Sequence, residues 1–125
     1  MKKFIFTLLF AYTFCIGCKS DNPRELIVKK WRITDITAPN MVVPDSIKNA
    51  LRQATMEFTK DGKFLITGLG MGDDQSGTYS LSDDGKKLIT VTYGRSETNE
   101  INELTKIKMI ITDLRNSSKL TAVPK

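Results

Sequence analysis

The chain has 125 residues, which suits a single domain, and its 19 Lys and Arg against 14 Asp and Glu give a formal charge of +5. The basic residues are spread along the chain without the stripe and interleaved aromatics typical of nucleic-acid binding, so we expect no nucleic-acid partner. The absence of His removes the commonest general base and metal ligand, and the two cysteines, Cys15 and Cys18, leave the rest of the chain without a disulfide.

The first 17 residues have the three parts of a secretory signal. Lys2 and Lys3 form a basic start, an almost wholly apolar run covers residues 4–14, and a small residue stands at the expected cut. The run is shorter than the roughly 20 apolar residues that a membrane-spanning helix needs. We therefore interpret residues 1–17 as a segment that is removed.

Residues 15–18, with the sequence Cys-Ile-Gly-Cys, resemble the lipobox of bacterial lipoproteins. The resemblance implies that Cys18 is diacylated on sulfur, becomes the first residue after cleavage and is acylated on its new amine. Two or more acyl chains give stable anchoring. The alternative is a plain secretory signal with a chance cysteine. On the first interpretation, residues 18–24 are a lipidated tether and residues 25–125 form a domain on the outer membrane, at its periplasmic or cell-surface face.

Residues 26–36 alternate apolar and polar side chains and predict a first strand. Trp31 and Ile33 are on one face, and the phase then changes, which predicts a bulge near Asp35.

One short helix is expected between the first strand and the second. Asp45 or Ser46 is expected to cap its start, and an apolar stripe follows at helical spacing. The stripe consists of Ile47, Ala50, Leu51 and Ala54. So short a helix must lie on an apolar surface to be stable.

From residue 55 onward the pattern alternates strands with tight turns. Two Asp-Gly turns, at residues 60–63 and 83–86, indicate hairpins, and the glycine-rich segment 68–77 indicates a loop. With the first strand this gives eight candidate strands. We predict an all-β fold, an antiparallel meander that closes into a roughly eight-stranded barrel, because closure removes the two exposed edges of an open sheet.

The period-two pattern also predicts which side chains face the barrel interior. The predicted inward set is Trp31, Ile33, Met56, Phe58, Phe64, Ile66, Tyr79, Leu81, Ile89, Val91, Tyr93, Ile107, Met109, Ile111 and Leu120. An eight-stranded barrel either fills with side chains or holds one small molecule. Because the chain is short and has no disulfide in this region, a packed interior is favoured. The alternative is a shallow pocket at the open end, with the helix near Ile47 and Leu51 as a lid and the 68–77 loop as its rim.

The pattern from residue 26 onward resembles the lipocalin-like domains of bacterial lipoproteins, of the type found in the Bacteroidetes group. The resemblance rests on Trp31 between Lys30 and Arg32, on the hairpin over residues 55–64, and on the segment 77–88. It implies a barrel that carries a small apolar ligand, with Trp31, Phe58, Phe64, Tyr79 and Tyr93 as candidate contacts, and it carries over no catalytic residue. The main expected role of Trp31 is to seal one end of the core.

No group of residues points to catalysis, a metal or a cofactor. Asp73 and Asp74 do not have the spacing of a calcium loop, and the serines lack a base to activate them. Two functions stay open: a membrane-anchored binding or carrier module for a small apolar ligand, or a non-enzymatic interaction protein of an envelope assembly with a packed core. The protein partner is not identified by the sequence.

Overall fold

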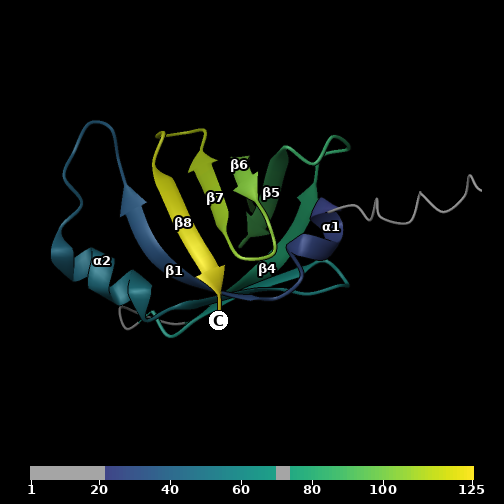
Figure 1. Cartoon of the computed structure of the whole chain (residues 1–125), viewed down its shortest axis with the longest axis horizontal. Coiled ribbons are helices and arrows are strands. Elements are labelled where there is room, and N and C mark those ends of the chain that lie inside the picture. The colour runs from purple at the N-terminus through teal and green to yellow at the C-terminus, as the bar shows by residue number, and fades with distance from the viewer. Residues whose placement is uncertain (1–21, 70–73) are drawn as a thin grey trace, which may run out of the picture.

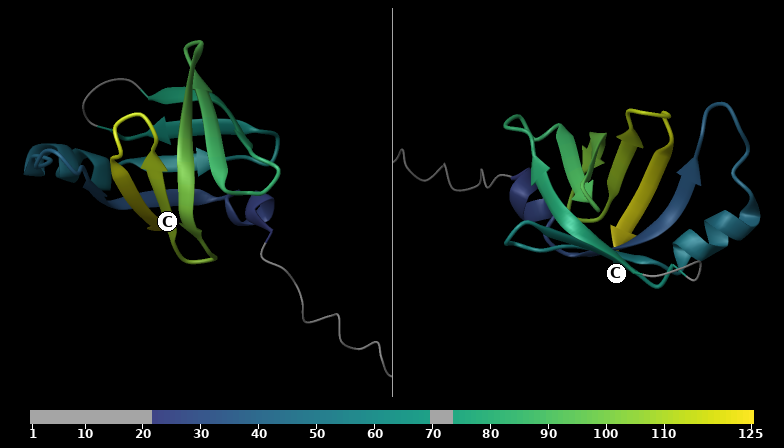
Figure 2. Two further views of the ribbon diagram at one scale, coloured as in Figure 1. Left: turned by 90° about the horizontal axis from the view of Figure 1, so that it is seen from above. Right: turned by 180° about the vertical axis from the view of Figure 1, so that it is seen from behind.

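The computed structural model describes residues 22–69 and 74–125. The predicted signal segment, Cys18 and residues 70–73 of the predicted glycine-rich loop lie outside these ranges. Within them, eight antiparallel strands pair in chain order and the last returns to the first, so the sheet is a closed barrel (Figures 1 and 2). The predicted all-β, eight-stranded barrel is confirmed.

The strands are joined mostly by short turns, as the meander pattern predicts. Their bounds are β1 (Lys30–Thr37), β2 (Thr55–Phe58), β3 (Lys63–Thr67), β4 (Gln75–Leu81), β5 (Lys87–Thr92), β6 (Arg95–Leu104), β7 (Met109–Asp113) and β8 (Lys119–Pro124). The predicted bulge in the first strand is present, because the register of β1 against β8 shifts between Ile33 and Asp35. β4 begins at Gln75, inside the predicted loop, and β6 begins at Arg95, earlier than its apolar pattern indicates.

A short helix that was not predicted, α1 (Pro23–Leu26), precedes the barrel. The Asn22 side chain accepts a hydrogen bond from the Arg24 backbone N–H at 3.0 Å, and Pro23 stands in the first turn, where a missing N–H costs nothing. This Asn-Pro pair was the signal for the helix. Leu26 and Ile27 are buried, so α1 is fixed to the barrel.

The predicted helix between the first two strands is present as α2 (Asp45–Arg52). Its N-cap is Pro44 and no side chain caps it, so the prediction that Asp45 or Ser46 caps it was wrong. α2 packs beside β1, where the Arg52 Nε donates to the Thr34 carbonyl at 3.2 Å. Because β2 pairs with β1 only as far as Arg32, α2 lies along the part of β1 that β2 leaves unpaired.

The two helices lie on opposite sides of the barrel (Figures 1 and 2). In an up-and-down barrel alternate turns share an end. The turns that follow β2, β4 and β6 therefore lie at the end where β1 begins, together with α1. We call this the α1 end. Among the described residues, no helix has the length and apolar composition needed to cross a bilayer.

The barrel interior is filled by one cluster of buried side chains contributed by seven of the strands and by the segment after α1. The cluster consists of Ile27, Trp31, Ile33, Met56, Phe58, Phe64, Leu81, Leu88, Met109, Ile111 and Ala122. Ile66, Tyr79 and Leu120 are partly buried against it, so most of the predicted inward set is confirmed. The packed interior favoured by the sequence is the one observed.

The predicted orientation of β5 was wrong. Leu88 and Thr90 face the interior, being 1% and 7% exposed, whereas Val91 is on the outside. Leu88 pairs with the buried Leu81 of β4, and this register determines which face turns inward. The apolar alternation of Ile89 and Val91 therefore belongs to the outer face of the barrel.

Two further residues of the predicted inward set lie at turns. Tyr93 and Gly94 both have positive φ, 51° and 76°, as in a two-residue hairpin turn between the paired Thr92 and Arg95. Tyr93 is 82% exposed. Ile107, in the turn between β6 and β7, is 74% exposed, so its predicted inward position was also wrong.

Candidate functional site

Three of the five predicted ligand contacts form one aromatic group in the barrel. The ring centroid of Phe58 lies 5.2 Å from that of Phe64 and 5.0 Å from that of Tyr79, the second pair edge to face. Phe58 and Phe64 are paired across β2 and β3, which brings them to the same face. Both are buried, so they contact the core.

The Trp31 side chain is fully buried, and its one polar group makes a hydrogen bond. Its indole N–H donates to the Ile27 carbonyl at 3.0 Å, which ties β1 to the segment that follows α1. The Lys29 Nζ lies 5.1 Å from the ring centroid. This arrangement matches the structural role expected for Trp31, a large ring sealing one end of the core.

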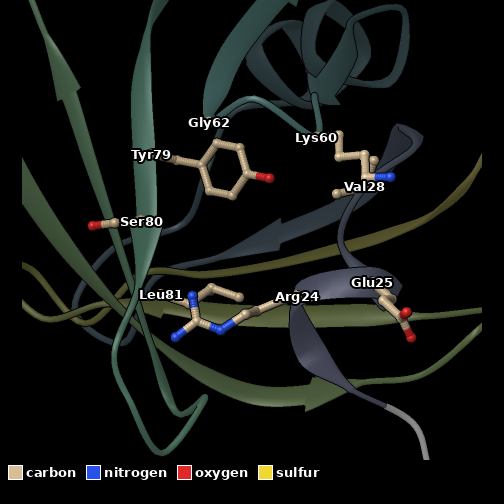
Figure 3. Close-up of a pocket in the computed structure, with 8 residues that line it drawn as sticks. All are labelled: Arg24, Glu25, Val28, Lys60, Gly62, Tyr79, Ser80 and Leu81. Carbon is tan, nitrogen blue, oxygen red and sulfur yellow. The ribbon is translucent and has the colours of Figure 1, made fainter.

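Of the five predicted contacts, Tyr79 lines a cavity at the α1 end of the described domain. Its hydroxyl donates to the Thr59 carbonyl at 2.7 Å, and its ring forms part of the cavity wall (Figure 3). Burial, and secondarily the charge of Asp61, raise the pKa of the Tyr79 hydroxyl above its ordinary value of 10.0. The group is therefore a neutral hydrogen-bond donor at physiological pH.

Tyr93 is separated from the other four. As described above, it occupies an exposed hairpin turn, at the end of the barrel opposite α1. Its predicted place in a common interior site with Phe58 and Tyr79 was therefore wrong.

A cavity of about 500 Å³ opens at the α1 end, between α1 and β4 (Figure 3). Val28, Tyr79 and Leu81 give it apolar walls. The other lining residues are Arg24, Glu25, Lys60, Gly62 and Ser80. The alternative pocket predicted from the sequence was at the opposite end, bordered by α2 and the 68–77 loop, and residues 70–73 of that loop lie outside the described residues.

Local structure fixes both sides of this cavity. Pro23 of α1 packs so closely on Gly85, in the turn between β4 and β5, that a Cβ on this glycine would lie 2.7 Å from the proline ring. On the other side the Tyr79 N–H donates to the Gly62 carbonyl at 3.0 Å, and Gly62 has a φ of +86° in the turn between β2 and β3. The cavity is therefore formed by turns and a helix that the barrel holds in place.

The charges at the cavity mouth are mixed. Arg24 extends toward Leu81 and Ser80, whereas the Glu25 carboxylate points away from them (Figure 3). Lys60 also lines the cavity, from the turn between β2 and β3 (Figure 3). Two cations thus border an apolar space, an arrangement suited to a molecule with an apolar body and an anionic group.

Sequence reasoning missed most of this site. The lining residues Arg24, Glu25 and Val28 belong to α1 and to the segment after it, and the local signal for that helix is the Asn-Pro pair at residues 22 and 23. Within residues 22–69 and 74–125, no group of three or more Cys, Asp and Glu side chains is placed to hold a metal ion.

Comparison with known proteins agrees with the barrel architecture. A family model described as a lipocalin-like domain matches residues 27–111. The fold is similar to the crystal structure of a lipocalin-like protein from Bacteroides uniformis, with a TM-score of 0.60, 15% identity, and coverage of 80% of this chain and 99% of that one. It is also similar to that of a DUF4847 family protein from Bacteroides vulgatus, with a TM-score of 0.57, 8% identity, and coverage of 78% and 93%. No curated protein sequence matches this chain.

Proposed function

The chain belongs to the lipocalin-like domain family, and from this premise we propose that it is a binding module of the bacterial cell envelope, anchored by a lipid on Cys18. Its ligand is a small molecule with an apolar body and an anionic group, and it occupies the cavity at the α1 end. The observation that carries the proposal is a cavity of about 500 Å³, within the size range of small-molecule sites, with Tyr79 and Leu81 as walls and Arg24 at the mouth.

The packed core explains why the cavity at the α1 end is preferred over the barrel interior. Trp31, Phe58 and Met109 occupy the interior almost without exposure, and a ligand there would have to displace them. Binding at the α1 end leaves the core intact. We propose a binding role and not a catalytic one, because the lipocalin-like fold is typically non-enzymatic.

A fluorescent fatty acid and the alcohol with the same chain test the ligand class. The variant in which Arg24 and Lys60 are both replaced by Ala should bind the fatty acid about fivefold less tightly, since an exposed ion pair contributes up to ~1 kcal/mol. Its affinity for the alcohol should be unchanged. Arg95→Ala, which removes an exposed cation at the opposite end, is the matched control.

A second pair of variants tests the position of the ligand. Val28→Trp should fill the cavity and abolish binding of both probes, whereas Val42→Trp, at a loop position that is 90% exposed, should have no effect. Thermal unfolding of both variants checks that the barrel is intact. Unchanged fatty-acid binding by a folded Val28→Trp variant would contradict the proposal, and so would native mass spectrometry and probe titrations that both find no ligand.

The anchor is tested separately. Cys18→Ser should release the protein from the membrane fraction of its host, because the substitution removes the sulfur that would carry the diacyl group. Cys15→Ser should remain in the membrane fraction. A Cys18→Ser protein that still sediments with membranes would show that the lipid-anchor proposal is wrong. Protease treatment of intact cells then distinguishes the periplasmic face of the outer membrane from the cell-surface face.

The packed interior also favours a second candidate function, a non-enzymatic interaction protein of an envelope assembly. Chemical crosslinking in cells followed by purification tests it. Reproducible recovery of one partner, together with an absence of probe binding, would favour this second function, whereas recovery of the protein alone would count against it.

A further inference from the structure

The charges of the barrel are divided unequally between its two ends. The α1 end comprises residues 22–30, the turns at 59–63, 82–87 and 105–108, and Lys125. These segments hold ten of the sixteen Lys and Arg residues that the structure describes, but only four of the twelve Asp and Glu residues. The α1 end is therefore strongly basic, and the remainder of the described domain has a slight acidic excess.

The same end presents an exposed apolar side chain. Ile107 is 74% exposed and stands between Lys106 and Lys108 at the tip of the turn between β6 and β7. The turn is held by its own hydrogen bonds: the Thr105 N–H donates to the Lys108 carbonyl at 2.9 Å, and the Ile107 N–H donates to the Thr105 Oγ1 at 3.2 Å. The isoleucine is thus held outward in a defined turn.

Contacts tie this turn to the start of the barrel. The Lys29 Nζ donates to the Lys106 carbonyl at 3.3 Å, and Lys29 lies in the short segment between α1 and β1. Ile107 and α1 are therefore parts of one surface.

The position of Cys18 directs this surface toward the bilayer. Five residue steps separate Cys18 from Pro23, and an extended chain covers at most about 3.6 Å a step, or roughly 18 Å in all. A lipid on Cys18 would therefore keep α1 within about two Debye lengths of the membrane at physiological salt. This step rests on the proposed function.

We propose that the α1 end is a membrane-docking surface for anionic phospholipid: its lysines lie on the headgroups and Ile107 enters the interface. An apolar tip flanked by cations suits a surface that is negatively charged outside and apolar beneath. Docking would also turn the cavity of the binding proposal toward the membrane, from which an amphipathic ligand could enter.

The test uses the full protein purified from membranes and reconstituted into two kinds of vesicle, pure phosphatidylcholine and phosphatidylcholine mixed with phosphatidylglycerol. An environment-sensitive dye is attached to Ile107→Cys or, as control, to Tyr93→Cys, which is also exposed and lies at the opposite end. We expect a blue shift of the dye emission at position 107 only, only in the anionic vesicles, and reversed by high salt. Equal responses at both positions, or none at 107 in protein that floats with the vesicles, would overturn the proposal.

Charge reversal gives a second readout. Lys106→Glu with Lys108→Glu should remove the blue shift, whereas Arg95→Glu with Lys119→Glu, the same charge change at the opposite end, should preserve it. A chain that begins at Lys19 retains every strand and helix of the described residues, so its binding to anionic vesicles can be measured without the anchor. The first pair should weaken this binding by at least about tenfold, since each lysine near an anionic surface contributes ~1 kcal/mol.

These arms separate the two proposals. Failure of the wild-type protein to float with pure phosphatidylcholine vesicles would reject the anchor alone. If the chain from Lys19 binds vesicles with and without anionic lipid equally, the docking surface alone would be rejected.

Discussion

Two aromatic side chains that pack in or against the core each make one hydrogen bond to a connecting segment at the α1 end. Trp31 and Tyr79 each place an aromatic ring against the buried cluster and donate one hydrogen bond to a backbone carbonyl in a turn or loop. Each bond satisfies a polar group that the apolar surroundings would otherwise leave unpaired. Each of these residues therefore packs against the core and also holds a connecting segment of the α1 end in place.

Tyr79→Phe should lower the free energy of unfolding by about 1 kcal/mol at pH 7, because it removes one hydrogen bond and leaves the Thr59 carbonyl without this donor. The pKa of the hydroxyl is raised in the folded state, so its contribution is fully present below pH 10 and is lost as the pH rises through the folded-state pKa. Urea unfolding followed by Trp31 fluorescence measures both effects. Tyr93→Phe is the control, and equal stability of the two variants would contradict the assigned role.

Two carboxylates stabilise turns at the same end. The Asp61 carboxylate accepts a hydrogen bond from the Thr59 hydroxyl, and the Asp84 carboxylate accepts one from the Ser82 hydroxyl. These hydrogen bonds are the main reason why the pKa of each carboxyl lies below its ordinary value of 3.8. Their contribution to stability is present above pH 3.8 and is lost as the pH falls through the lowered pKa. NMR titration of the carboxyl carbons should give both pKa values below 3.8, and values at or above it would show that these turn bonds are absent in solution.

At the scale of the elements, the orientation of β5 follows its pairing with β4 and not its own apolar alternation. Its most regular apolar alternation, Ile89 and Val91, is on the outer face, while Leu88 and Thr90 are inside. β4 imposes this orientation by pairing Leu81 with Leu88 and Tyr79 with Thr90. A register shift of one residue would have reversed every side chain of the strand.

Leu88→Ala should therefore lower the free energy of unfolding by about 2–5 kcal/mol, because it leaves a cavity in the core. Val91→Ala should cost less than about 1 kcal/mol, since Val91 is on the outer face. Chemical unfolding of both variants measures the difference. A larger loss for Val91→Ala would show that the observed orientation of β5 is wrong.

Gly77 is required by the approach of β4 to β5. A Cβ at this position would lie 2.0 Å from the Val91 carbonyl oxygen, so the two strands would have to separate. Gly77→Ala should destabilise the barrel by about 1–3 kcal/mol or more. Unfolding of this variant in urea, compared with Ser76→Ala at the neighbouring exposed position, measures the effect, and equal stability would mean that the strands are farther apart in solution.

At the scale of the whole molecule, one core serves all of the strands. The buried cluster includes residues from seven of them, and Ile101 and Leu104 of β6 pack against it. Strand closure and core formation are therefore mutually dependent, since neither half of the barrel contains a core of its own.

The described domain should consequently unfold in a single transition. Trp31, the one tryptophan of the chain, reports on the core, and far-ultraviolet circular dichroism reports on the strands. The two unfolding curves should coincide at every urea concentration. Separate midpoints would show that part of the barrel opens independently.

The sequence by itself determined the fold class, the number of strands, the helix after the first strand, the bulge near Asp35 and most of the core. These features depend on local periodicity and turn chemistry, which are properties of neighbouring residues. The tertiary structure alone decided the inward face of β5, the exposure of Tyr93 and Ile107, and the location of the cavity. Those depend on which strand ends and turns meet across the barrel, because pairing register and closure bring together residues such as Val28 and Tyr79 that no local pattern connects.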